Sequence, residues 1–128
     1  MTIIETLLKA TDGLLMPSES EYPFEAFRWS GENELTDQKL LQLTSHPADS
    51  PVETVALDYL FRNVAYEKEW HDEVQKANVS KFQNLVSTLE KNLTDIKVYR
   101  VGTIDIDVYI VGKNEGELAG LSTKVVET

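Results

Sequence analysis

Two aspartates near the end of the sequence, Asp105 and Asp107, have the spacing of a catalytic carboxylate pair. They stand two positions apart in TIDIDVYIV, so in a strand both side chains point to the same face of the sheet. Paired carboxylates can perform acid–base catalysis when burial separates their pKa values. The same alternation is also what a half-exposed strand requires for structure alone. We favour the structural interpretation, with Lys124 or Arg100 as a cross-strand partner.

The two histidines add little to a catalytic hypothesis. His46 lies in a proline-flanked loop, and His71 lies in EWHDE, near the start of a long helix. Neighbouring side chains on a helix point about 100° apart, so His71, Asp72 and Glu73 cannot converge on one metal ion. Cysteine, a phosphate-binding glycine loop and a serine nucleophile motif are absent from the sequence. We therefore predict a protein that is not an enzyme and has no cofactor of its own.

The charge balance points to a basic partner. The chain has 12 Lys and Arg against 22 Asp and Glu, which gives a net charge of −10. A protein with this charge is repelled by nucleic acid and by anionic membranes, so we expect it to bind neither directly. It is attracted instead to basic proteins, including proteins that themselves bind nucleic acid.

Length and composition fit a single domain over residues 1–128. The chain is 41 % hydrophobic, which is enough for a sizeable core at this length. No stretch approaches the roughly 18 apolar residues of a membrane-spanning helix. The first residues, MTIIETLLKATDG, lack the features of a secretory signal. We expect a soluble, cytoplasmic protein.

Three helices are indicated by caps and by hydrophobic periodicity. Thr2 and Glu5 form a capping box, and Thr36 caps a second, shorter helix. In the third helix, apolar residues recur every three and four positions. The predicted helices span residues 3–12, 37–43 and 71–93. Strands are predicted over residues 24–30 and 52–57, and a loop over residues 16–23 precedes the first strand.

The last third of the sequence predicts an antiparallel sheet. Alternating apolar residues and short turns indicate three consecutive strands, with a turn at Gly102 and a hairpin turn over residues 112–116. In the middle strand Ile104, Ile106 and two further aliphatic residues share one face, and helices must cover such a face. The strands span residues 96–101, 103–111 and 117–126. We predict an α+β fold.

Three stretches of the sequence resemble a known family. They are DGLLMPSESEYPFEAF at residues 12–27, KFQNLVSTLEKNL at residues 81–93, and residues 99–128, which include YRVGTIDIDVYIVG and LAGLSTKVVET. Together they resemble the nuclease A inhibitor family of small acidic cyanobacterial and bacterial proteins. That family inhibits sugar-non-specific, Mg-dependent DNA/RNA nucleases whose active site is a ββα-metal unit. The resemblance implies an α/β/α sandwich around an antiparallel sheet.

The resemblance also implies which residues contact the nuclease. Glu19, from the SES loop, and Thr128, the last residue, correspond to the residues that enter the nuclease active site. Trp70 corresponds to an aromatic residue at the contact, and Ser18, Ser20 and Glu127 complete the expected partner-binding set. The implied complex is 1:1 with a ββα-metal endonuclease, and the inhibitor is a monomer when free.

The chemistry of these groups suits a metal nuclease. The hydroxyl and carboxylate oxygens of a terminal threonine are hard ligands for Mg²⁺, so Thr128 is expected to bind the nuclease's metal in the complex. Glu19 offers a carboxylate for an arginine fork or a metal-bound water. An acidic adaptor, or a nucleic-acid mimic that binds some other basic protein, is the alternative function.

Overall fold

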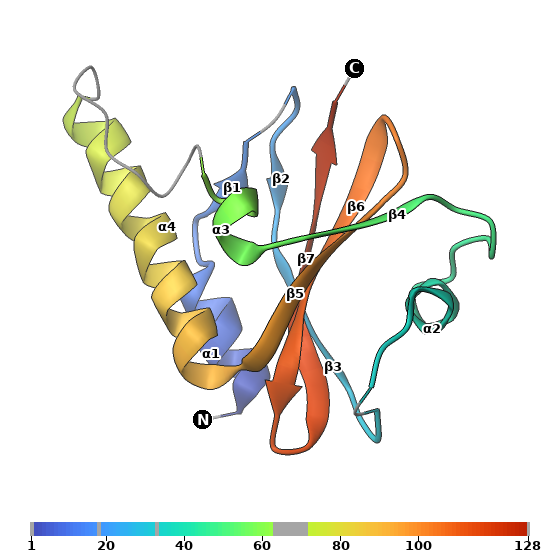
Figure 1. Ribbon diagram of the computed structural model, residues 1–128. Helices are drawn as coiled ribbons and strands as arrows, with labels where there is room; N and C mark the ends of the chain where they lie inside the picture. Colours follow the sequence, from blue (N-terminus) through green and yellow to red (C-terminus); the bar gives the residue numbers. More distant parts are fainter. Residues whose placement is uncertain (1, 18, 33, 63–71, 128) are drawn as a thin grey trace.

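A five-stranded antiparallel sheet forms the centre of the protein, with the strand order β3-β7-β6-β5-β4 (Figure 1). This arrangement comes from a computed structural model that describes residues 2–17, 19–32, 34–62 and 72–127. The strands are β3 (Glu25–Trp29), β4 (Val52–Val55), β5 (Thr94–Val101), β6 (Asp105–Asn114) and β7 (Glu117–Val126). The predicted α+β class is confirmed.

Helices lie on both faces of this sheet, as Figure 1 shows. On one face, α1 (Ile3–Ala10) and α4 (Glu73–Asn92) bury the main core, with α3 (Leu57–Leu60) beside them. On the other face, α2 (Asp37–Leu43) covers a smaller apolar cluster. The predicted sandwich of helix, sheet and helix layers is therefore what the structure contains. The fully buried side chains of the main core include Leu7, Phe82, Leu85, Leu89, Val98, Val108, Ile110 and Leu121.

Side-chain caps explain where the helices begin. The hydroxyl of Thr2 accepts a hydrogen bond from the Glu5 amide at 3.2 Å, and that of Thr36 accepts one from the Lys39 amide at 3.1 Å. Asp72 and Gln75 form a reciprocal capping box at the start of α4. Two of the caps are those predicted from the sequence. α1 and α4 are slightly shorter than predicted, since α1 ends at Ala10 and α4 runs from Glu73 to Asn92.

The hairpin between β6 and β7 is tighter than predicted. Gly112 and the two residues after it belong to β6, so the turn consists of Glu115 and Gly116 alone. Both have positive φ, 52° and 80°, which matches the twist of the flanking strands. This turn sets the register of β7 against β6, from Asn114 opposite Glu117 to Asp105 opposite Val126.

Three other expectations differ from the structure. The strand predicted over residues 52–57 ends at Val55, because α3 begins at Leu57. The predicted loop over residues 16–23 contains a small two-stranded sheet, β1 (Leu15–Met16) and β2 (Tyr22–Pro23). Ile104, expected on the buried face with Ile106, is 54 % exposed because β6 begins at Asp105, two residues later than predicted, and Ile104 lies in the preceding bend. None of the described helices is long and apolar enough to cross a membrane.

Substitution of Gly120 by alanine should strongly destabilise the fold. A Cβ atom at this position in β7 would lie 1.7 Å from the carbonyl oxygen of Ile110 in β6, and backbone there cannot move without breaking the pairing. We expect Gly120→Ala to lower the free energy of unfolding by about 3 kcal/mol or more in urea titrations. Ser122→Ala, a half-buried control in the same strand, should change it by less than about 0.5 kcal/mol. Equal unfolding midpoints for the two variants would contradict this close approach.

Candidate functional site

Segments from both ends of the sequence meet at one end of the sheet. The connection between β1 and β2, the last residues of β7 and the turn between β5 and β6 lie together there (Figure 1). The amide of Glu19 donates to the carbonyl oxygen of Val126 at 3.4 Å. The amide of Glu127 donates to the carbonyl oxygen of Ile104 at 2.9 Å. The structure thus brings Glu19 beside Glu127, two residues that the sequence singles out from opposite ends.

The small β1–β2 sheet positions the Glu19 loop. Met16 pairs with Tyr22, so residues 17–21 form a short connection whose two ends are held together. The side chain of Met16 is only 5 % exposed and packs in the main core. The hydroxyl of Thr123 in β7 donates to the carbonyl oxygen of Pro23 at 2.9 Å, which ties β2 to the strand that carries the end of the sequence. The loop is thereby anchored to β7.

Arg100 organises the charges beneath this surface. Its guanidinium contacts the carboxylate of Glu127 at 2.7 Å and that of Glu53 at 3.3 Å. The Arg100 side chain is only 13 % exposed, whereas the two carboxylates are more than half exposed. Arg100, one of the two partners predicted for Asp105 or Asp107, therefore pairs with Glu53 and Glu127 instead. The positive charge of Arg100 offsets the repulsion between these two carboxylates and leaves their outer sides open to solvent.

The six residues of the expected binding set divide into two groups. Glu19 and Ser20 lie in an exposed bend at the tip of the loop, and Glu127 is exposed after the end of β7. Ser18, Trp70 and Thr128 lie outside the described residues. The group that the structure does place forms an acidic surface, with Glu21 in the same loop as Glu19.

A cavity that the sequence did not predict opens beside this acidic surface. It has a volume of about 430 Å³ and lies where Tyr59, Arg62 and Arg100 approach Val126 and Glu127. The guanidinium of Arg62 stacks over the Tyr59 ring at 3.8 Å from its centre. Tyr59 lies in α3 and Arg62 lies in the turn that follows, three positions along the chain, a spacing that could have indicated their contact. Only the fold brings them close to the end of β7.

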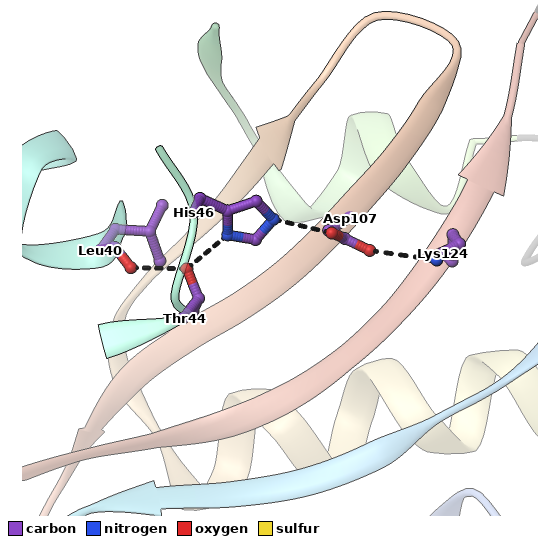
Figure 2. A network of polar contacts seen from close by, with 5 residues as sticks. All are labelled: Leu40, Thr44, His46, Asp107 and Lys124. Atoms are coloured by element: carbon purple, nitrogen blue, oxygen red, sulfur yellow. Dashed lines mark hydrogen bonds and ion pairs between the residues drawn. The ribbon is translucent and has the colours of Figure 1, made fainter. Parts of the chain in front are cut away.

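Asp107, the second candidate for acid–base chemistry, is part of a structural network (Figure 2). One carboxylate oxygen lies 2.7 Å from Nε2 of His46, and the other lies 3.7 Å from Nζ of Lys124. Nδ1 of His46 lies 2.7 Å from the hydroxyl of Thr44, which caps the C-terminus of α2. The partner predicted from the strand register, Lys124, is confirmed, whereas His46 was not predicted because its loop is distant in sequence.

The hydrogen bonds of this network identify it as a brace for α2. Thr44 donates its hydroxyl proton to the carbonyl oxygen of Leu40 at 2.7 Å, and the same hydroxyl lies 2.7 Å from Nδ1 of His46, so these contacts join the end of α2 to the His46 loop. Burial, and secondly the Asp107 carboxylate, raise the pKa of the neighbouring Tyr109 phenol. The described residues contain no cluster of carboxylates and histidines that could hold a metal ion.

Removal of the histidine from this brace should loosen α2. His46→Ala leaves Asp107 without its closest hydrogen-bond partner and detaches the end of α2 from β6. We expect the free energy of unfolding to fall by about 1–3 kcal/mol in urea titrations. Asp49→Ala, an exposed change in the same loop, is the matched control and should have an effect below about 0.5 kcal/mol. A His46→Ala protein as stable as this control would show that the network contributes nothing.

The comparison with known families agrees with this geometry. The chain matches the family described as nuclease A inhibitor-like protein over residues 1–128, its whole length. The protein belongs to this family. The family resemblance expected from the sequence is confirmed, and membership indicates an inhibitor whose partner is a nuclease. No curated protein matches the chain.

Proposed function

We propose that this family member inhibits a sugar-non-specific, Mg-dependent DNA/RNA nuclease of the ββα-metal class by covering its active site. Glu19 and Thr128 are directed at the catalytic Mg²⁺ and the basic residues around it. The observation that carries the proposal is the hydrogen bond from the Glu19 amide to the Val126 carbonyl. It joins the acidic loop to Val126, two residues before Thr128 in the sequence, and so supports presentation of both groups to one partner.

The chemistry of the target explains why carboxylates are suitable. A metal nuclease holds the scissile phosphate with Mg²⁺ and with arginine or lysine side chains. Carboxylate oxygens of an inhibitor satisfy the same groups but contain no bond that the enzyme can cleave. The hydroxyl and a carboxylate oxygen of Thr128 would close a six-membered ring with the ion. Glu19 would bind a basic side chain or a metal-bound water.

The anchoring of both segments supports tight binding. The Glu19 loop is tied to β7 through Thr123 and through the Val126 carbonyl. Glu127 is held through its amide by Ile104 and through its carboxylate by Arg100. Groups that are already ordered lose little entropy on association, so more of the contact energy appears as affinity.

The net charge of −10 supports rapid association. A nuclease that binds polyanions has a basic surface around its active site, and an acidic inhibitor is steered toward it at low salt. Ser18, Ser20 and Trp70 are proposed to contribute further contacts in a 1:1 complex. The free protein is proposed to be a cytoplasmic monomer that protects the cell from its own nuclease and catalyses no reaction.

A substitution in the loop distinguishes a direct contact of Glu19 with the nuclease from the general effect of negative charge on association. Glu19→Gln removes a carboxylate directed at the active site, and we expect it to weaken binding by roughly 2–5 kcal/mol because its partner loses a charged contact. Glu21→Gln makes the same charge change in the same loop and should mainly slow association. Inhibition constants and association rates measured with DNA and RNA substrates distinguish the two. Equal inhibition constants for the Glu19→Gln and Glu21→Gln proteins would reduce Glu19 to a steering charge.

Extension of the sequence beyond Thr128 tests the metal contact. A few added residues convert the terminal carboxylate into a peptide bond, so the chelate with Mg²⁺ is lost while the fold remains. We expect inhibition to weaken by at least tenfold, or about 1.4 kcal/mol. The same residues added before α1, at the opposite end of the sheet from the end of β7 (Figure 1), are the control and should leave inhibition unchanged. Full inhibition by the extended protein would refute the terminal contact.

The charge of −10 also favours the second candidate, an acidic adaptor or nucleic-acid mimic for another basic protein. Competition distinguishes the two functions. An inhibitor that covers the active site is displaced by saturating substrate, whereas an adaptor binds its partner with that site occupied.

A further inference from the structure

Two exposed apolar side chains lie next to the end of β7. Ile104 is 54 % exposed, and Tyr59 is 46 % exposed. Ile104 adjoins Glu127 through a backbone hydrogen bond, and Tyr59 lines a cavity together with Glu127. A single exposed hydrophobic residue is ordinary on a protein surface. What distinguishes this pair is that both residues adjoin Glu127 and that each is held in place.

The turn that presents Ile104 is rigid. Gly102 has φ of 111°, and a Cβ atom there would lie 2.6 Å from the carbonyl oxygen of Asp105, so the turn requires glycine. The Gly102 amide donates to the carbonyl oxygen of Pro51 at 3.1 Å. The Ile104 carbonyl accepts from Glu127 at 2.9 Å. The isoleucine is therefore fixed by its neighbours on both sides while its side chain remains in solvent.

Tyr59 is held by a different contact. The Arg62 guanidinium lies 3.8 Å from the centre of the Tyr59 ring, and its Nη1 donates to the Tyr59 carbonyl oxygen at 2.6 Å. The phenol borders the cavity of about 430 Å³, whose walls include Met16, Val55, Leu60 and Val125. A partner side chain can enter this cavity beside the acidic surface and bury apolar area on both sides of the contact.

Charge complementarity favours a basic partner at this surface. The Glu19 loop and Glu127 lie in the same region as the two apolar residues, so a complementary cleft would be basic and bordered by apolar groups. Apolar contacts around an ion pair exclude water from it and so strengthen it. Because rigid apolar groups also lose little entropy on docking, their main effect is to slow dissociation.

We propose that Ile104 and Tyr59 dock against the apolar rim of the nuclease's active-site cleft and determine how long the inhibitor stays bound. This inference rests on the proposed function and extends it to residues outside the acidic set. The carboxylates then govern encounter and the contact with the metal, while the two apolar residues govern release.

The test measures dissociation of the full-length protein from a Mg-dependent ββα-metal endonuclease that the wild-type protein inhibits. Ile104→Ser and Tyr59→Ser should each raise the dissociation rate constant by roughly ten- to a hundredfold. Leu8→Ser is the matched control, because Leu8 in α1 is 48 % exposed. Circular dichroism and urea unfolding verify that all three variants remain folded.

Salt dependence distinguishes this role from charge. The increase in the dissociation rate constant caused by Ile104→Ser should be the same at about 0.05 M and about 0.5 M NaCl, because burial of apolar surface is not screened. The effect of Glu19→Gln on this rate constant should shrink at the higher salt concentration.

Three outcomes would contradict the inference. If the wild-type protein inhibits and the folded Ile104 and Tyr59 variants dissociate at the wild-type rate, this inference alone is overturned. Absence of any inhibition by the wild-type protein would overturn the proposed function as well. A wild-type dimer that Ile104→Ser separates in sedimentation would assign the surface to self-association and also overturn the inference.

Discussion

The pairing of β7 with both of its neighbours is the constraint on which the rest of the structure depends. β6 pairs with β7 along its whole length, from Glu117 to Val126, and β3 pairs with its first half. The absence of a side chain at Gly120 is what permits this close approach between strands. β7 leads directly into Glu127, whose amide donates to the Ile104 carbonyl, so the sheet itself fixes the position of this residue. The candidate site is an extension of the sheet and not an independent loop.

Formation of an acidic surface carries a cost that the surrounding contacts offset. Carboxylates gathered in one region of a surface repel one another. The buried side chains of Met16 and Phe24, on either side of the Glu19 loop, provide the opposing stabilisation. Phe24 packs against Phe61 and Phe82 with ring centres 6.5 and 6.4 Å apart. Arg100 offsets the repulsion further, so an anionic surface can persist on a stable core.

The two faces of the sheet contribute differently. The face covered by α1 and α4 contains the larger core and stabilises the position of β7. The face covered by α2 contains a smaller cluster, and its short helix depends on polar contacts from Thr44, His46 and Asp107. A carboxylate that the sequence made a candidate for catalysis thus has an architectural role. An inhibitor needs such a rigid scaffold because its binding energy depends on ordered groups.

The sequence by itself determined the fold class, most of the helices and strands, and the family, because caps and hydrophobic periods are local properties. Thr2, Thr36 and the alternation from Ile106 to Val111 predicted their elements correctly. Only the tertiary structure decided that Glu19 lies beside Val126, that Arg100 forms an ion pair with Glu127, and that His46 contacts Asp107. It also exposed Ile104, which periodicity had assigned to the core. These contacts join residues far apart in the chain, and no local pattern records which distant strand or loop a side chain will meet.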